Sequence, residues 1–242
     1  EDSPETLNVQ VIERVVNDIV LTGLTRTRPS VVKKLIKTRP GKAFNENTWD
    51  SDLRRLYSTF WFKDITPDSK PTDQIGRFDL LMDFEEDRTG LINFGAALDP
   101  RSRLAGNIRY SDSNWRGTGQ TLSAGLQQDT AGTGLSASIE YVNPYMDSRD
   151  TSLAVRAFSR INSYFTGSGI GATDSPDSQR FDERRTGASV AVSKIFRDIY
   201  SLTYGASFER IETLKLRTNT ATDFIQQDGD LVVLNAQFAR DR

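Results

Sequence analysis

The feature that most constrains the fold of this chain is an alternation of apolar and polar residues that recurs in eight segments after residue 88. In the first segment Ile92, Phe94 and Leu98 alternate with Asn93 and Gly95. A period of two is the side-chain spacing of a β-strand, so each segment predicts an antiparallel strand with one apolar and one polar face. The other segments are residues 103–110, 121–127, 135–141, 153–160, 188–193, 202–209 and 232–238.

Two architectures share this alternation. A soluble sandwich buries the apolar faces, whereas a transmembrane barrel turns them to lipid and its polar faces to a wet lumen. The apolar faces here are rich in Ala and Gly, whose side chains supply less volume than a packed core needs. Aromatic residues such as Tyr110 and Tyr141 occur at the ends of the segments. Both features favour the barrel. Connection lengths also suggest two different sides, with short turns at 99–102, 129–133 and 197–198 and long stretches at 166–182 and 218–229.

Composition removes several classes of function. The chain has no Cys and no His, which excludes disulfides, thiolate nucleophiles, Ser-His-Asp triads and the usual zinc sites. Its 31 basic and 33 acidic residues nearly balance, which argues against a nucleic-acid binder. No apolar run approaches the roughly 18 residues of a membrane helix. We therefore expect no catalytic residue of these kinds, no metal site and no cofactor.

A change in composition divides the chain at the charged run 85–88. The first 87 residues hold five of the eight prolines but only three of the seventeen glycines. We predict an α+β domain over residues 1–87 and strands of an outer-membrane β-barrel over residues 88–242. The first domain reads strand, helix, helix, strand, strand. Its elements are a strand at 12–21, a helix opening at Pro29, a helix capped by Asn45 or Asn47, and strands at 61–65 and 77–84.

Several short segments resemble a known family when they are taken in order. Residues 23–27 (GLTRT), 40–44 (PGKAF) and 52–65 (DLRRLYSTFWFKDI) resemble a POTRA domain. The remainder of the chain is similar to the start of the barrel in the BamA/TamA-type outer-membrane assembly family. The segments that carry this second likeness are 90–95 (GLINFG), 110–120 (YSDSNWRGTGQ), 141–145 (YVNPY) and 238–242 (FARDR).

The chain also departs from that family. The family's barrels have about sixteen strands, and eight are predicted here. The family's Val/Ile-Arg-Gly-Phe loop motif and a final strand with a terminal aromatic residue are both missing, and there is one POTRA domain where bacterial members have several. The sequence therefore predicts a β-α-α-β-β POTRA domain followed by about half of a larger barrel.

The resemblance implies a non-enzymatic role in the assembly and insertion of outer-membrane β-barrel proteins. In such a family the first barrel strand is the edge that templates incoming strands by β-augmentation. On this sequence that lateral seam contains Leu91, Asn93, Phe94, Gly95 and Ala97. The glycine at 95 would weaken the strand and ease its separation.

A second edge is expected in the POTRA domain at Phe62, Lys63, Asp64 and Ile65, where a client strand or an accessory lipoprotein would bind. The implied partners are unfolded outer-membrane proteins, the lipid bilayer, and accessory assembly lipoproteins or periplasmic chaperones, with no nucleic acid. The implied location is the outer membrane of a Gram-negative bacterium or an organelle, with the POTRA domain in the periplasm or its equivalent. Two other functions stay open on the sequence alone: a passive pore or structural barrel of another family, and a soluble all-β binding module.

Overall fold

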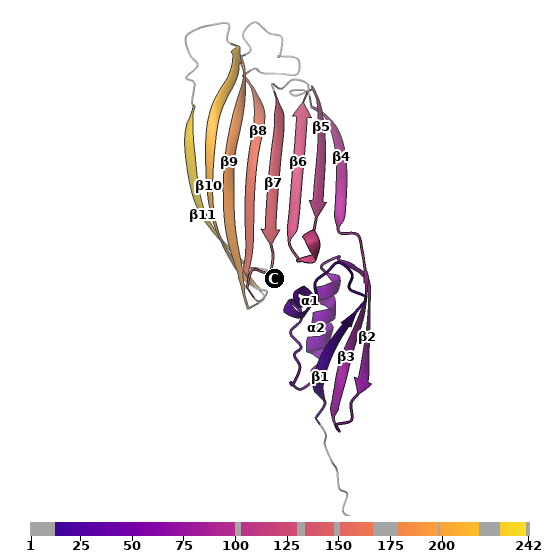
Figure 1. Cartoon of the computed structure of the whole chain (residues 1–242). Helices are drawn as coiled ribbons and strands as arrows, with labels where there is room; N and C mark the ends of the chain where they lie inside the picture. The colour runs from indigo at the N-terminus through magenta and orange to yellow at the C-terminus, as the bar shows by residue number, and fades with distance from the viewer. Residues whose placement is uncertain are drawn as a thin grey trace, which may run out of the picture. The chain divides into compact units, whose positions relative to one another are not determined.

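The computed structural model describes residues 13–99, 103–129, 134–147, 151–166, 179–197, 199–217 and 228–240. The chain divides into two units, Glu1–Arg88 and Thr89–Arg242. The first contains a three-stranded sheet with two helices, and the second contains an eight-stranded antiparallel sheet (Figure 1). In the described part of the chain, no helix is both long enough and apolar enough to span a membrane.

The first unit has the predicted order of strand, helix, helix, strand, strand. Its strand β3 lies between the other two, parallel to β1 and antiparallel to β2. Each strand ends later than predicted, most of all β2, which continues to residue 71, whereas β1 and β2 begin later than predicted, at Val15 and Phe62. The elements are β1 (Val15–Thr22), α1 (Pro29–Leu35), α2 (Glu46–Tyr57), β2 (Phe62–Pro71) and β3 (Arg77–Glu86).

Local sequence explains where the helices begin and how they are joined. Pro29 opens α1, where its missing N–H costs nothing. Asn45 caps α2, because its side-chain oxygen accepts a hydrogen bond from the Thr48 N–H at 3.0 Å, so it rather than Asn47 is the cap. Asp52 on α2 is buried and accepts hydrogen bonds from the main chain of Lys37 and Thr38 at 2.6 and 2.8 Å. This carboxylate fixes the segment after α1 against α2.

The hydrophobic core of the described chain lies almost entirely in the first unit. All but one of its buried hydrophobic residues belong to this unit, and the exception is Ile161. Leu56 of α2 and Met82 of β3 are fully buried, and the rings of Phe62 and Phe84 lie 4.7 Å apart. The first unit is thus a packed α+β layer of the kind that folds in water.

Glu86, the last residue of β3, holds the loop that follows β1. Its carboxylate accepts hydrogen bonds from the main-chain N–H groups of Thr25, Arg26 and Thr27 at 3.0, 2.8 and 2.6 Å. Burial raises the pKa of Glu86, but hydrogen bonds from Thr25, Thr27 and Arg26 outweigh it and lower the pKa from 4.5 to about 2. These hydrogen bonds from residues 25–27 to Glu86, called the Glu86 clamp below, are therefore strongest while the carboxylate is ionised.

This pKa predicts an acid-dependent contribution to stability. Because the folded-state pKa lies below the ordinary value of 4.5, the stabilisation is complete above about pH 4.5 and is lost as the pH falls towards 2. Glu86→Gln should lower the free energy of unfolding of residues 1–88 at pH 7 by about 1 kcal/mol, since the site is partly solvated. Urea denaturation followed by circular dichroism should show this difference shrinking from pH 4.5 to pH 2. A difference that stays constant over that range would contradict the clamp.

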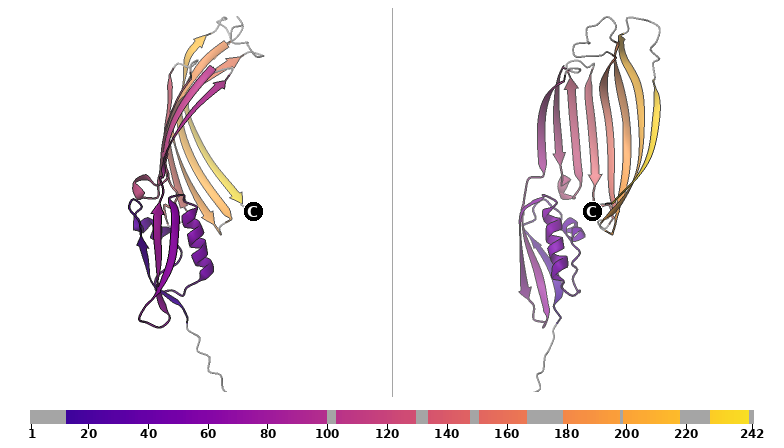
Figure 2. Two further views of the ribbon diagram at one scale, coloured as in Figure 1. Left: turned by 90° about the vertical axis from the view of Figure 1, so that its right-hand side faces the viewer. Right: turned by 180° about the vertical axis from the view of Figure 1, so that it is seen from behind.

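The second unit is one antiparallel sheet in which every strand pairs with its neighbours in sequence, in the order β11 to β4 (Figure 1). All eight predicted strands are present, and the sheet curves across its width (Figure 2). The strands are β4 (Gly90–Asp99), β5 (Arg103–Asp112), β6 (Thr121–Asp129), β7 (Leu135–Asn143), β8 (Thr151–Thr166), β9 (Gln179–Phe196), β10 (Tyr200–Arg217) and β11 (Gly229–Arg240).

The topology corrects the expected division into a short-turn side and a long-loop side. Successive connections of an antiparallel meander fall at alternate ends of the sheet. The connections of β4 to β5 and of β6 to β7 therefore lie at the same end as those of β8 to β9 and of β10 to β11. The short turns at 99–102 and 129–133 thus share an end with the long stretches. Each end therefore carries connections of different lengths, since the opposite end has the longer connection 113–120 as well as the short one at 197–198.

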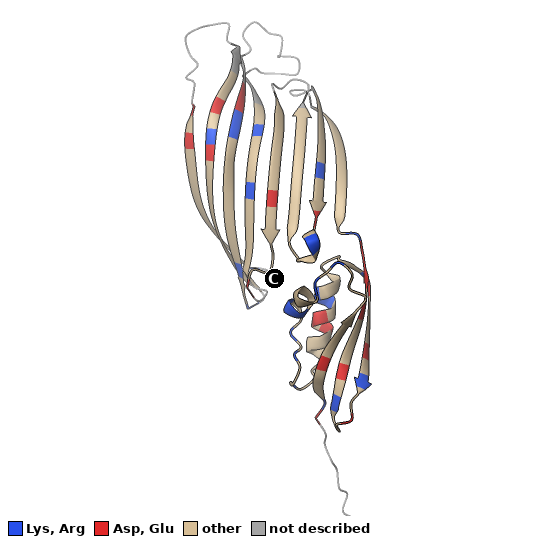
Figure 3. Ribbon diagram, in the orientation of Figure 1, with Lys and Arg blue, Asp and Glu red and all other residues tan. Residues whose placement is uncertain are grey.

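The apolar face of this sheet is not covered by protein in the described structure. Phe94, Ile139 and Leu234 are 77%, 51% and 79% exposed, and the strands show long uncharged stretches (Figure 3). A contiguous apolar surface of this extent is unstable in water and is typical of a lipid-facing wall. The packed-sandwich alternative fails here, because the sheet has no second layer and contributes a single buried hydrophobic side chain among its described residues.

A pair of arginine substitutions tests which face meets lipid. Val190 lies on the apolar face of β9, and Ser207 lies on the polar face of β10 opposite Ser189. Val190→Arg should lower the free energy of unfolding in lipid vesicles by about 2–4 kcal/mol, because it places a charge in hydrocarbon. Ser207→Arg should have little effect, because its side chain reaches the wet face. Equal losses in a urea titration of the two variants would rule out the assignment of faces.

Candidate functional site

The first barrel strand, β4, is an edge of the eight-stranded sheet. It pairs with β5 along its whole length without a bulge, and in the described structure it has no partner on its other side. The strand at the opposite end of the sheet, β11, likewise pairs with β10 alone among the described strands. A lone edge presents a row of unpaired N–H and C=O groups that another strand can bind.

The hydrogen-bond phase of β4 decides which of its residues face the open side. The Ser113 N–H donates to the Thr89 carbonyl oxygen at 3.1 Å, and the register of β4 and β5 continues this pair as Leu91 with Ser111 and Asn93 with Arg109. Hydrogen-bonded pairs alternate along an antiparallel ladder. The odd-numbered residues of β4 therefore bond to β5, and the even-numbered residues turn their main-chain groups outward.

This phase divides the five residues predicted for the seam. All five lie on β4, as expected. Phe94 presents its main chain to the open side, whereas the other four, Leu91, Asn93, Gly95 and Ala97, are bonded to β5. Sequence reasoning missed the open main-chain groups of Ile92, Ala96 and Leu98. Nothing in the alternation of side chains reports which N–H groups of a strand are paired, so only the position of the ladder finds them.

Gly95 allows the side chain of Asn107 on β5 to lie close to the main chain at the middle of β4. The side-chain amide of Asn107 on β5 lies 2.7 Å from the point where a Cβ on Gly95 would stand. A larger residue would have to displace this side chain. The glycine therefore leaves room for the Asn107 side chain on the polar face, in addition to any loosening of the strand.

A buried polar network holds the beginning of β4. Asp112, at the end of β5, is fully buried and accepts hydrogen bonds from the Thr89 hydroxyl at 2.7 Å and from the Asn114 N–H at 3.0 Å. The Asn114 side-chain oxygen in turn accepts a hydrogen bond from the Gly119 N–H at 2.8 Å. Buried polar groups with matched partners rigidify their surroundings. The first strand is thus fixed at its beginning and has an open edge along its length.

The predicted POTRA edge, Phe62 to Ile65 on β2, has a different character. Phe62 and Ile65 point into the core and are 5% and 3% exposed, while Lys63 forms an ion pair with Glu85. The Tyr57 hydroxyl bonds to the outward main chain of Ile65, accepting from its N–H at 3.1 Å and donating to its carbonyl oxygen at 3.0 Å. The groups that would recruit a strand at Ile65 are therefore already paired.

The rest of the β2 edge is also blocked. The Thr72 N–H donates to the Arg77 carbonyl oxygen, which places Pro67, Ser69 and Pro71 on the side that faces away from β3. The two prolines have no N–H, and the Ser69 N–H donates to the Asp68 carboxylate at 2.7 Å. Proline on an edge strand is a recognised protection against unwanted pairing. From residue 65 to residue 71 this edge therefore has no free donor.

Within the described residues, no group of three or more acidic side chains is arranged to hold a metal ion. The open side of β4 can bind a partner through its main-chain N–H and C=O groups. An α+β unit followed by antiparallel strands with one apolar and one polar face is the arrangement of an outer-membrane β-barrel protein that carries a separate folded domain.

Comparison with known families identifies the chain more closely. The Omp85 superfamily domain matches residues 114–241, and the POTRA family described as surface antigen variable number repeat matches residues 14–87. The first match covers more than half of the chain. The chain belongs to the Omp85 superfamily, and its location is an outer membrane, either that of a bacterium or the outer envelope of a chloroplast.

Two curated relatives cover different parts of the chain. It is 26% identical over 218 residues to outer envelope protein 80, chloroplastic, of Oryza sativa subsp. japonica, which covers 84% of the chain and 32% of the rice protein. It is 28% identical over 144 residues to the outer membrane protein assembly factor BamA of Buchnera aphidicola, covering 59% of the chain and 23% of that protein. The chain thus spans about a third or less of the length of these relatives.

Solved structures show the same fold. BamA from Haemophilus ducreyi lacking POTRA domains 1–3 superposes with a TM-score of 0.69 at 16% identity, over 93% of this chain and 43% of that one. CdiB from Escherichia coli superposes with a TM-score of 0.65 at 12% identity, over 94% and 42% of the two chains. At such identities the likeness establishes the fold, a POTRA unit with a partial barrel, which confirms the predicted fold class.

Removing the Tyr57 hydroxyl tests whether it blocks the β2 edge. Tyr57→Phe should free the main chain of Ile65 and raise the rate of amide hydrogen exchange at that residue by about tenfold, the loss of one hydrogen bond. Exchange at Met82, in the centre of the sheet, serves as the internal control and should not change. An unchanged rate at Ile65 in nuclear magnetic resonance spectra would show that Tyr57 does not guard the edge.

Proposed function

We propose that this chain belongs to a non-enzymatic factor that assembles or inserts β-barrel proteins in an outer membrane, and that β4 is the edge to which client strands add. The observation that supports the proposal is the contrast between the two edges in one chain. The β2 edge is blocked by Tyr57, two prolines and Asp68, whereas β4 offers the main-chain groups of Ile92, Phe94 and Ala96. An edge left open in a chain that protects another edge is a candidate for strand addition.

The environment of β4 supports the same role. Its open side lies in a wall whose apolar face is suited to lipid, where an unpaired main-chain group costs several kcal/mol. Binding a client strand would satisfy those groups. The network of Asp112 and Thr89 would keep the beginning of β4 in place while a strand adds along the rest of it.

The proposed clients are unfolded outer-membrane proteins, as the BamA relatives suggest by name. Recognition through main-chain groups suits a factor with many clients, because it places little demand on client sequence. Accessory lipoproteins or chaperones would bind to surfaces other than the β4 edge. The β2 residues Phe62, Lys63, Asp64 and Ile65 remain a proposed second contact, which would require displacement of Tyr57.

Two adjacent alanines offer a matched test of the proposed seam. The Ala96 N–H faces the open side of β4, whereas the Ala97 N–H belongs to the hydrogen-bonded pair with Ala105. Ala96→Pro should therefore abolish strand addition and leave the β4–β5 ladder intact, while Ala97→Pro should break the ladder itself. The measurement is insertion of a client barrel into vesicles by the whole protein, with circular dichroism as the check on folding.

Different results separate the alternatives. Normal insertion by a folded Ala96→Pro variant would refute the proposal that client strands add to β4. A passive pore would conduct ions equally well with and without Ala96→Pro and would show no client crosslinking from a cysteine at position 94. A client that crosslinks to β11 and never to β4 would move the accepting edge to the other end of the sheet.

A further inference from the structure

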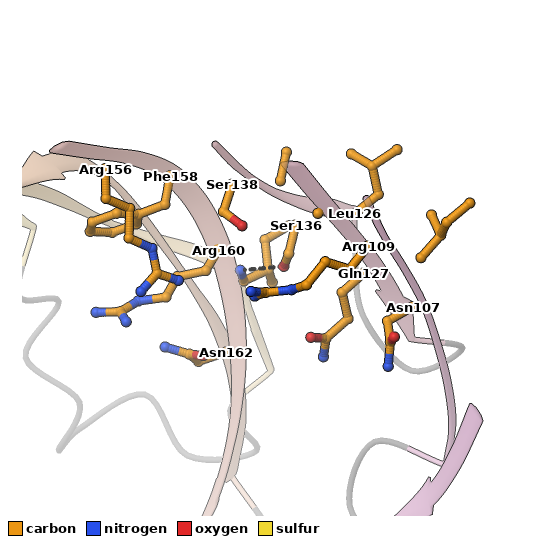
Figure 4. A pocket seen from close by; sticks show the side chains of 14 residues that line it. Asn107, Arg109, Leu126, Gln127, Ser136, Ser138, Arg156, Phe158, Arg160 and Asn162 are labelled. Atoms are coloured by element: carbon orange, nitrogen blue, oxygen red, sulfur yellow. Dashed lines mark hydrogen bonds between the residues drawn. The ribbon is translucent and has the colours of Figure 1, made fainter. Parts of the chain in front are cut away.

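The polar face of the eight-stranded sheet contains a hollow of about 390 Å³ that is lined by three arginines and no acidic residue. Arg109 enters it from β5, and Arg156 and Arg160 enter it from β8, so that guanidinium groups from non-adjacent strands face one space (Figure 4). A volume of this size is in the range of small-molecule sites.

The floor of the hollow consists of short side chains. Gly125 of β6 and Ser136 and Ser138 of β7 lie between the arginines of β5 and those of β8. Pairing of β7 with β8 ends at Ala137 and Ser159, although β8 continues, and the Ile161 N–H donates to the Ser136 hydroxyl at 3.0 Å instead (Figure 4). The long side chains at the sides and the small ones between them produce the depression.

The arginines are held in place by their neighbours. The ring of Phe158 lies between the two arginines of β8, with its centroid 5.7 Å from the Arg156 Cζ and 4.9 Å from the Arg160 Cζ. Arg160 is also within 3.3 Å of the Glu209 carboxylate. The Arg109 Nε lies 3.8 Å from where a Cβ on Gly125 would stand, so that glycine leaves room for the guanidinium to cross β6.

Of the three arginines, only Arg160 is paired with an acidic residue of this face among the described residues. Glu209 lies 3.6 Å from Arg185 as well as close to Arg160, and Glu183 is bonded to Arg185. Glu140 is opposite Arg156 in the β7–β8 register, yet within the described residues neither Arg109 nor Arg156 has a carboxylate within ion-pair distance. Two guanidinium groups therefore face the hollow with their charge uncompensated.

We infer that Arg109, Arg156 and Arg160 form an oxyanion-binding site on the wall of the lumen, with a carboxylate or phosphate group as its ligand. Planar guanidinium groups bind both oxyanions through paired N–H donors, more strongly beside a low-dielectric wall than in bulk water. The amides of Asn107, Gln127 and Asn162 line the same hollow and add neutral donors. The site uses no residue of β4 and is independent of the proposed seam.

The test measures protection of individual arginines in the full chain in detergent micelles. Phenylglyoxal modifies accessible guanidinium groups, and peptide mapping by mass spectrometry reports each arginine separately. The probes are inorganic phosphate and the dipeptide N-acetyl-Glu-Glu-amide. Saturating probe should lower the labelling of Arg109 and Arg156 by about tenfold, with one shared midpoint, because they bind one ligand. Arg210, which lies on the opposite face, pairs with Asp230 and serves as the control within the same molecule.

A variant shows whether the arginines form one site. Arg156→Gln should raise the probe concentration that half-protects Arg109 by about tenfold, whereas the matched Arg210→Gln should leave it unchanged. Protection by phosphate alone assigns a phosphate-bearing ligand, and protection by the dipeptide assigns acidic side chains. The inference is overturned if neither probe protects Arg109 and Arg156, if Arg210 is protected equally, or if protection of Arg109 does not depend on Arg156.

Discussion

In a sheet that lies in hydrocarbon, each main-chain N–H and C=O group needs a hydrogen-bond partner, because no water is present to provide one. The second unit of this chain meets that requirement from β5 to β10, where each strand has a neighbour on both sides. Among the described strands, β4 and β11 each have a neighbour on one side only, so the requirement is not met along their outer edges. The first unit, which has a packed core of its own, blocks the β2 edge with Tyr57 and with prolines. The β2 and β4 edges are therefore treated differently, and the proposed function follows from that difference.

The rest of the second unit is consistent with an edge that must stay both open and ordered. Asp112 fixes the residue before β4 through the Thr89 hydroxyl, and the unbroken pairing with β5 continues that order along the strand. The apolar face carries exposed aliphatic and aromatic side chains, and the polar face carries the arginine hollow. The two faces therefore differ in chemistry, and strand addition at β4 would extend both.

Much of this fold is predictable from the sequence because side-chain alternation reports burial directly. The eight strands and the β-α-α-β-β order were within reach of local patterns, which also narrowed the cap of α2 to Asn45 or Asn47, and the structure identifies it as Asn45. The phase of main-chain pairing was not, since side-chain alternation does not report which N–H groups are bonded. The outward main-chain groups of Ile92 and Ala96 could be identified only from the hydrogen bond between Thr89 and Ser113, because it sets the phase of pairing along β4.

Contacts between different helices and strands account for the other differences. The hydrogen bond from Tyr57 to Ile65 depends on how α2 packs on β2, and no local sequence pattern predicts it. Arg109 and Arg156 meet in one hollow because β6 and β7 between them carry small side chains, which becomes visible once the register is known. Connection length was a poor guide to the ends of the sheet, whereas strand order settles it.

Amide hydrogen exchange along β4 tests the central claim most directly. With the ¹⁵N-labelled protein in micelles, the amides of Asn93, Gly95 and Ala97 should exchange slowly because they bond to β5, and those of Ile92, Phe94 and Ala96 should exchange fast. Addition of a peptide that corresponds to a client's terminal strand should slow the second set to the rate of the first. Uniform protection along β4 without peptide, or fast exchange at Ile92, Phe94 and Ala96 with the peptide bound, would contradict the account.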